Sequence, residues 1–279
     1  MPRVSPKTAE FLIKALLWFM TGFTLAILVL IILNITIKGL PQVTLTFLWE
    51  EPQHMGRAGG IFNTVVSTVY LTLLAIALAS PLGVGTAIYL TEYTREGWAT
   101  RFIRFGAECL AGVPSIILGL FGFVLFVIKL GLGWSILSGG LTLAIMVLPT
   151  IIRTSEEAIK AVPYSYREVC FSLGMSKWQT ITRVVLPSAL PGITTGIILS
   201  VGRSIGETAV VLFTAGAALR TPTSIFESGR SMAVHFYILA REGLSLPNAY
   251  GTAAILVISI LLINLTAYGL MQYFLKRYS

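Results

Sequence analysis

Long apolar segments alternate with short polar segments along almost the whole chain. An α-helix needs about twenty mainly apolar residues to cross a bilayer. Segments of this kind cover residues 11–37, 61–90, 103–128, 134–159, 186–216 and 250–275. An outer-membrane barrel would instead show short alternating segments separated by turns. The pattern therefore predicts an all-α integral membrane protein with six transmembrane helices.

Prolines in the second and third of these apolar segments are expected to bend them. Pro81 lies in the second segment, close to Gly83 and Gly85, and Pro114 lies in the third. Proline removes a backbone hydrogen-bond donor and clashes with the preceding turn, while glycine loosens a helix. We expect a kink near Pro81 and a bend at Pro114.

Composition supports a membrane protein and indicates its orientation. Hydrophobic residues make up 55% of the chain and charged residues 11%, with a mean hydropathy of +0.83, whereas soluble domains are about 25% charged. The net charge of +8 comes from basic residues scattered beside the apolar segments, so membrane topology explains it better than a nucleic-acid partner. Six helices place both termini on one side, and that side has twelve basic residues against six opposite. The positive-inside rule then predicts a protein of the cytoplasmic (inner) membrane with both termini in the cytoplasm.

Two opposite charges lie within the fifth apolar segment. Arg203 and Glu207 are four residues apart, about one helical turn, so a continuous helix would place them on the same face. A charge at bilayer depth costs roughly 3 kcal/mol or more, and such charges mark functional sites or internal pairs that fix helix packing. Small residues at four-residue spacing beside them favour close helix packing, so we expect this segment to lie inside the bundle.

The stretch 162–187 is too polar to span a membrane. We expect two short helices in it. The first covers residues 166–173, Gly174 ends it with a left-handed residue, and Ser176 caps a second helix that begins at Lys177. This pair would face the cytoplasm; the alternative is a helix that lies on the membrane surface.

A motif in this stretch resembles the EAA loop of ABC importer permeases. It consists of Glu168-Val169-Cys170, then Gly174, then Leu186-Pro187, with Val169 and Cys170 in place of the family's two alanines. The resemblance implies a cytoplasmic coupling helix that docks in a groove on an ATP-hydrolysing subunit. Glu168 and Gly174 are the matching positions.

The likeness extends over most of the chain and is greatest to the phosphate-specific permeases of these importers. It is carried by AGVPSIILGLF (111–121), LPTIIRTSEEA (148–158), VPYSYRE (162–168) and RSIGETA (203–209). It implies a type I ABC importer permease fold, with residues 1–60 forming the first transmembrane helix and outer loop. Residues 61–275 would then form the permease core, including the coupling segment 160–185.

The resemblance also implies that Arg153 and Arg203 lie on a phosphate pathway, since the family's matching arginines are implicated in phosphate passage. An arginine stays ionised and can bind two oxygens of an oxyanion that has lost its hydration. We expect Glu207 to hold Arg203 and to limit how tightly it binds the anion. For Arg153 the alternative is an interfacial arginine that reaches the cytoplasmic headgroups.

The predicted partners follow from the resemblance and from one motif that this chain lacks. It contains no GxxxxGK[ST] sequence, so we expect no catalytic residues in it and ATP hydrolysis on a pair of partner subunits. Further expected partners are a second permease subunit, typically a different chain, and an extracytoplasmic phosphate-binding protein. No cofactor or metal site is expected. The alternatives are a passive anion channel, an ABC permease for sulfate or molybdate, and, less favoured because no nucleophile–base pattern occurs, a membrane hydrolase.

Overall fold

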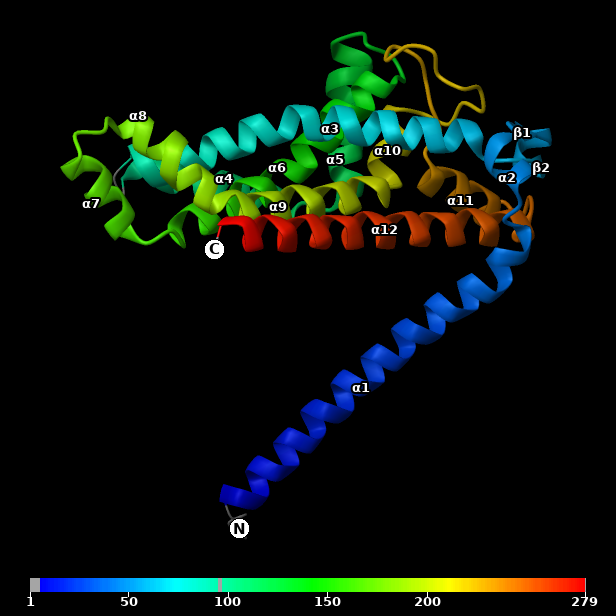
Figure 1. The fold of residues 1–279 in the computed structure, drawn as a ribbon. Coiled ribbons are helices and arrows are strands. Elements are labelled where there is room, and N and C mark those ends of the chain that lie inside the picture. Colours follow the sequence, from blue (N-terminus) through cyan, green and yellow to red (C-terminus); the bar gives the residue numbers. More distant parts are fainter. Residues whose placement is uncertain (1–5, 95–96, 279) are drawn as a thin grey trace.

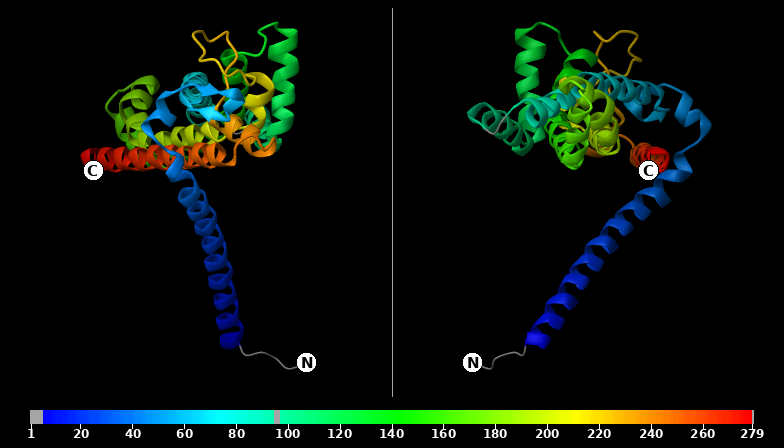
Figure 2. Two further views of the ribbon diagram at one scale, coloured as in Figure 1. Left: turned by 90° about the vertical axis from the view of Figure 1, so that its right-hand side faces the viewer. Right: turned by 60° about the vertical axis from the view of Figure 1, so that its left-hand side comes forward.

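The computed structural model describes residues 6–94 and 97–278, and helices make up nearly all of it (Figure 1). Long helices lie side by side and form the body of the molecule: α3 (Phe62–Ile88), α6 (Ile136–Lys160), α9 (Leu186–Ile205) and α12 (Leu246–Tyr278). A further long helix, α1 (Pro6–Gly39), leaves this body at one end and projects away from it (Figure 2). Its last turn packs on α12, where the Lys38 ammonium lies 5.1 Å from the centre of the Tyr250 ring.

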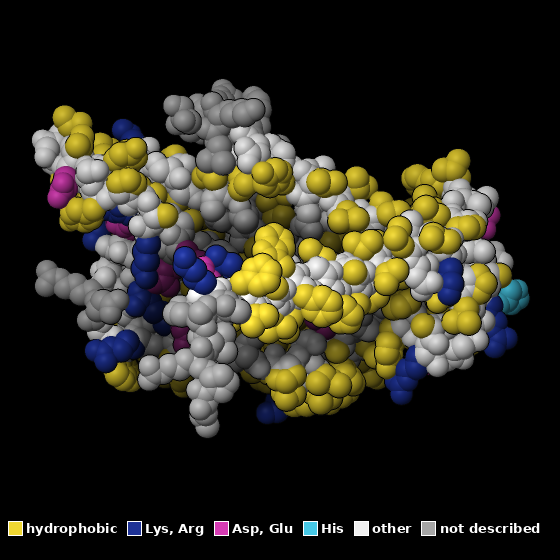
Figure 3. All heavy atoms as spheres, turned by 90° about the horizontal axis from the view of Figure 1, so that it is seen from below, with side chains coloured by type: hydrophobic (Ala, Val, Ile, Leu, Met, Phe, Trp, Pro, Cys, Tyr) yellow, Lys and Arg dark blue, Asp and Glu magenta, His cyan; other side chains and the backbone are white. Residues whose placement is uncertain are grey.

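The described helices confirm a membrane protein of the all-α class. Five of them are long and apolar enough to cross a bilayer, and a bent pair makes a sixth span if it is counted as one. Hydrophobic side chains cover much of the surface seen from below, with basic side chains toward the two ends (Figure 3). The first described turn of α1 and the last turn of α12 lie toward the same end (Figure 1); residues 1–5 and Ser279, the chain ends of the orientation prediction, lie outside the described residues.

The third span is bent far more sharply than a proline kink in a continuous helix. Helix α4 (Trp98–Gly112) meets α5 (Ser115–Gly122) and the π-helical η4 (Phe123–Lys129) at 104°. Between them Val113 is extended, as expected for a residue before proline. The predicted bend at Pro114 is confirmed. Helix α3, in contrast, continues through Pro81 and becomes π-helical only at η3 (Tyr89–Tyr93).

The core lies between α3 and α6, and small residues let the two helices approach closely. A Cβ atom added to Gly83 would lie 2.7 Å from Cγ2 of Ile151, and one added to Gly139 would lie 2.6 Å from a methyl group of Leu71. The main buried cluster contains Leu71, Ala75, Leu143, Val147, Ile151 and Val210. This pair of helices is the scaffold on which the ends of the molecule are built.

The end opposite the C-terminus carries short elements. After α1 come η1 (Leu40–Gln42), α2 (Leu45–Trp49), β1 (Pro52–Gln53), η2 (His54–Gly56) and β2 (Ala58–Gly59). The two strands pair antiparallel, with Pro52 opposite Gly59. Helix α11 (Met232–Arg241) lies between the fifth and sixth apolar segments, where the hydropathy pattern predicts no spanning helix. The helix has 10 residues, too few to cross a membrane, and the sequence analysis did not recognise Ser231 as its N-cap.

Candidate functional site

The fifth span is broken where the sequence predicts a continuous helix. Helix α9 ends at Ile205, and a new helix, α10 (Ala209–Thr214), begins after a gap that contains Glu207. The Glu207 carboxylate accepts hydrogen bonds from the backbone N–H groups of Ala209 (3.1 Å) and Val210 (3.4 Å). These N–H groups have no partner within their own helix, and a negative charge at a helix start satisfies them. The predicted pairing of Arg203 with Glu207 on one helical face is therefore wrong.

Arg203 is left exposed on the surface of the single chain, in the last turn of α9. Within the described part of the chain its guanidinium forms no hydrogen bond or ion pair. The next residue, Ser204, is buried, and its hydroxyl also lacks a protein partner. The break thus presents an uncompensated positive charge, which can bind an anion or a partner group.

Arg153 lies on the outer face of α6, nearer its end. Its Nε atom donates to Oε1 of Glu157 at 3.2 Å, and the two side chains are 78% and 66% exposed. The two residues are four positions apart, which places them on one face of α6. An exposed pair of this kind contributes little to stability, so Arg153 is free to exchange Glu157 for another anion.

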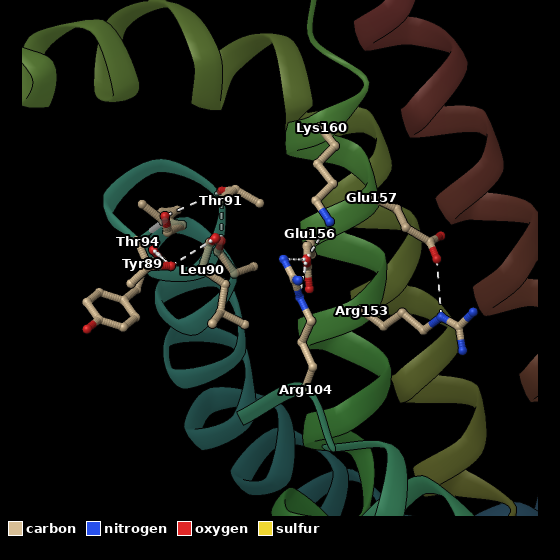
Figure 4. Close-up of polar contacts among 11 residues, drawn as sticks. Tyr89, Leu90, Thr91, Thr94, Arg104, Arg153, Glu156, Glu157 and Lys160 are labelled. Carbon is tan, nitrogen blue, oxygen red and sulfur yellow. Dashed lines mark hydrogen bonds and ion pairs between the residues drawn. The ribbon is translucent and has the colours of Figure 1, made fainter. Parts of the chain in front are cut away.

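A second acidic residue on α6 is held from two sides (Figure 4). Glu156 is buried; its Oε1 atom accepts from Nη2 of Arg104 at 2.8 Å and from Nζ of Lys160 at 2.6 Å. Together with Arg153 these residues line a cavity of about 450 Å³ between α4 and α6. Sequence reasoning did not single out Arg104, because 52 residues separate it from Glu156 and only the bend at Pro114 places α4 against α6.

The polar stretch forms the predicted helix pair, α7 (Tyr164–Ser172) and α8 (Lys177–Thr180), at the left-hand end of the molecule in Figure 1. Gly174 has φ of +77°, a left-handed conformation that favours glycine. Ser176 caps α8, and Gln179 bonds back to the Ser176 N–H, which completes a capping box. Beyond α8 the π-helical η5 (Ile181–Val185) continues into α9, so this spanning helix begins at Lys177 and not at Leu186.

The outer surface of α7 combines one acidic and several apolar side chains. Glu168 is exposed, and its carboxylate has no hydrogen bond or ion pair among the described residues. Large apolar side chains beside it are also exposed: Tyr164 67%, Val169 59% and Leu173 76%. Exposed apolar groups around an unpaired charge, at the polar end of a membrane protein, are typical of a docking surface.

The sequence analysis did not single out Arg167, which lies next to Glu168 on the opposite side of α7. Its side chain is buried, and Nη2 lies 2.6 Å from Oε1 of Glu92 at the end of α3. A separation of 75 residues hides this pair in the sequence. A feature that could have pointed to it is the spacing of three residues between Arg167 and Cys170, which places both side chains on one face of the helix.

At the opposite end, α11 buries a histidine. His235 is 1% exposed, and Nη1 of Arg230 lies 3.4 Å from its Nδ1 atom. Burial, reinforced by the charge of Arg230, lowers the pKa of His235 to about 4. The side chain is therefore neutral near pH 7. No cluster of three or more His, Cys, Asp or Glu able to hold a metal occurs among the described residues.

Comparison with known proteins finds a matching family and several similar transport proteins. Residues 79–279 match the family described as "Binding-protein-dependent transport system inner membrane component". The chain is 36% identical, over 87% of its length and 88% of the relative's, to the probable ABC transporter permease protein YqgI of Bacillus subtilis. It is 34% identical to the phosphate transport system permease protein PstA of Mycobacterium leprae, over 90% of this chain and 85% of that protein. Among solved structures, a chain of a bacterial alginate ABC transporter superposes with a TM-score of 0.66 over 93% of each chain at 17% identity.

Proposed function

We propose that this chain, which belongs to the family of binding-protein-dependent transport system inner membrane components, is the permease subunit of an ATP-driven importer of inorganic phosphate. The observation that carries the proposal is the 34% identity, over 90% of the chain, to a relative named as a phosphate transport permease. As an inner-membrane component the chain provides the route across the membrane, and a separate subunit hydrolyses ATP.

The proposed pathway includes Arg203 and Arg153. Arg203 has no partner in the described chain, and Arg153 has only an exposed one. Both are therefore able to bind a phosphate oxyanion through charge-assisted hydrogen bonds. Glu207 supports the pathway differently from the sequence expectation: it caps α10 and maintains the break beside Arg203.

The proposed assembly places a pair of ATP-hydrolysing subunits against α7 and α8, where Glu168 and Gly174 lie. A second permease subunit, of a different sequence, would pair with this one, and an extracytoplasmic phosphate-binding protein would deliver substrate at the end that carries α2 and α11. Both termini would then be cytoplasmic. Residues 1–60 would form the first transmembrane helix and outer loop, and residues 61–275 the permease core with its coupling segment 160–185.

The test is uptake of labelled phosphate by the reconstituted complex, with competition by sulfate and molybdate. We expect uptake to require ATP and to be displaced by phosphate better than by the other oxyanions. Uptake that persists without ATP while the membrane potential is held would instead indicate a passive channel. Preferential competition by sulfate or molybdate would reassign the substrate.

A variant tests the pathway. Arg203→Gln removes hydrogen bonds to a charged group, each worth about 1.5–3 kcal/mol, so we expect uptake at limiting phosphate to fall by at least about tenfold. Arg220→Gln is the matched control, since that side chain is 81% exposed on an outer segment. Normal transport by an Arg203→Gln protein of normal abundance would remove Arg203 from the pathway.

A further inference from the structure

Arg167 bonds to two other parts of the chain at the end of the molecule that carries α7. Its Nη2 and Nε atoms donate to Oε1 of Glu92, at 2.6 and 3.1 Å, and Nε also lies 3.4 Å from Oε2. Nη1 donates to the carbonyl of Val162 at 3.0 Å and Nη2 to that of Ile159 at 3.2 Å. One side chain of α7 is thus joined to the end of α3 and to the last turn of α6.

This pair is the most enclosed of the arginine–glutamate pairs among the described residues. The side chains of Arg167 and Glu92 are 10% and 9% exposed. A planar guanidinium that binds one carboxylate through two nitrogens fixes orientation as well as distance. The carbonyls at the end of α6 carry the negative end of the helix dipole and add to the attraction.

The turn that holds Glu92 is itself closed by hydrogen bonds (Figure 4). The hydroxyl of Thr94 donates to the carbonyl of Leu90 at 3.1 Å, and that of Thr91 donates to Ala87 at 2.8 Å. The backbone stays helical from α3 into η3, so that Glu92 belongs to the end of α3. A movement of Glu92 is therefore a movement of the end of α3.

Arg167 and Glu168 are adjacent in sequence and face opposite ways. Glu168 lies on the exposed surface of α7, while Arg167 lies inward on the scaffold of α3 and α6. A cavity of about 450 Å³ lies between α7 and the helix ends, lined by Glu92, Arg167 and Lys177 among others. Because of this space, α7 has room to tilt against the body unless a specific contact prevents it. Besides the Arg167–Glu92 pair, the ammonium of Lys177 lies 5.1 Å from the ring centre of Tyr93.

We propose that Arg167 is a positioning residue for coupling: its bonds to Glu92 and to the end of α6 make α7 move together with α3 and α6. A displacement imposed on the outer surface of α7 then reaches the membrane-spanning scaffold and is not absorbed in the cavity. The inference rests on the proposed function, in which an ATP-hydrolysing subunit docks on α7. It adds the residue pair through which that docking acts on the spanning helices.

The experiment compares ATP hydrolysis with phosphate uptake in the same proteoliposomes, per assembled complex and below the unfolding temperature of every variant. For Arg167→Gln and Glu92→Gln we expect ATP hydrolysis within about twofold of the original complex and uptake reduced at least tenfold. The double variant should be no worse than either single variant, because residues that act as one unit are not additive. Arg167→Lys keeps the charge without the two-nitrogen contact and should fall between.

Arg101→Gln is the control, because Arg101 is an exposed arginine on α4, outside the coupling segment 160–185. It should leave the ratio of uptake to hydrolysis unchanged. Variants that keep the original ratio, or that lose hydrolysis, assembly and uptake in parallel, would overturn the inference. Failure of the original complex to transport phosphate with ATP would overturn the proposed function itself, so the two failures are distinguishable.

Discussion

Two arginine–glutamate pairs on the same side of the molecule differ in almost every physical respect. Arg153 and Glu157 are one helical turn apart on α6, 78% and 66% exposed, with a single contact at 3.2 Å. Arg167 and Glu92 come from α7 and the end of α3, are 10% and 9% exposed, and approach to 2.6 Å. The pair that is visible in the sequence is thus the weak one. The pair that holds elements together is formed only when distant segments meet.

The largest expected effect is at the buried pair. Arg167→Gln or Glu92→Gln leaves one charge buried without its partner, which typically costs about 3–5 kcal/mol. We expect a clear drop in the unfolding temperature of the purified protein in detergent. The Arg167→Gln/Glu92→Gln double variant should recover part of the loss, since no unpaired charge remains. If the two single variants, the double variant and the unmodified protein unfolded at the same temperature, the buried pair would not stabilise the fold.

A pH scan extends the comparison to the buried histidine at the opposite end. The pKa of His235 is lowered from 6.5 to about 4, by burial and then by Arg230. Above pH 6.5 the histidine is neutral in both folded and unfolded chains. As the pH falls from 6.5 toward 4, only the unfolded chain takes up the proton, so the folded state loses up to about 3 kcal/mol.

The measurement is unfolding temperature against pH for the original protein and for His235→Asn. The variant cannot titrate here, so its curve should be flatter between pH 6.5 and 4. Parallel curves would mean that His235 does not contribute to the acid sensitivity.

A smaller effect is expected at Gly174, which positions α8 relative to α7. With φ of +77°, a side chain at this position costs about 1–2 kcal/mol. No atom lies within 4 Å of an added Cβ, so the cost is in the backbone alone. Gly174→Asn, which tolerates this conformation better, should lose less stability than Gly174→Ala; the reverse order would argue against a left-handed residue 174.

The smallest stability effect is expected at the exposed pair. Glu157→Gln or Arg153→Gln should change the free energy of unfolding by less than about 1 kcal/mol. If Arg153 contacts the transported anion, uptake should nevertheless fall in Arg153→Gln and not in Glu157→Gln. A large loss of stability in either variant would show that the comparison between the two pairs is wrong.

The local features of α7 and α8 were predictable nearly residue by residue. Gly174 and Ser176 act within a few residues of themselves, one through backbone conformation and the other through a cap on the next turn. The bend at Pro114 was predictable for the same reason, although its size of 104° was not. Features that depend only on residues close by in the chain can be predicted from the sequence.

The predicted pairing of Arg203 with Glu207 is wrong, because four-residue spacing implies a contact only if the helix is continuous. Glu207 instead satisfies the first N–H groups of α10. Helix α11 was hidden by its short length, and Arg104 and Arg167 by the long stretches of chain between them and their partners.

By itself the sequence determined that this protein crosses a membrane with helices, that a pair of short helices separated by Gly174 precedes the fifth span, and which family it resembles. These follow from hydropathy, helix caps and turn residues, which act over one or two turns of chain. The tertiary structure alone decided where the fifth span breaks and which charges are paired. A long-range ion pair depends on the packing of α3, α6 and α7 in three dimensions, and no local periodicity encodes it.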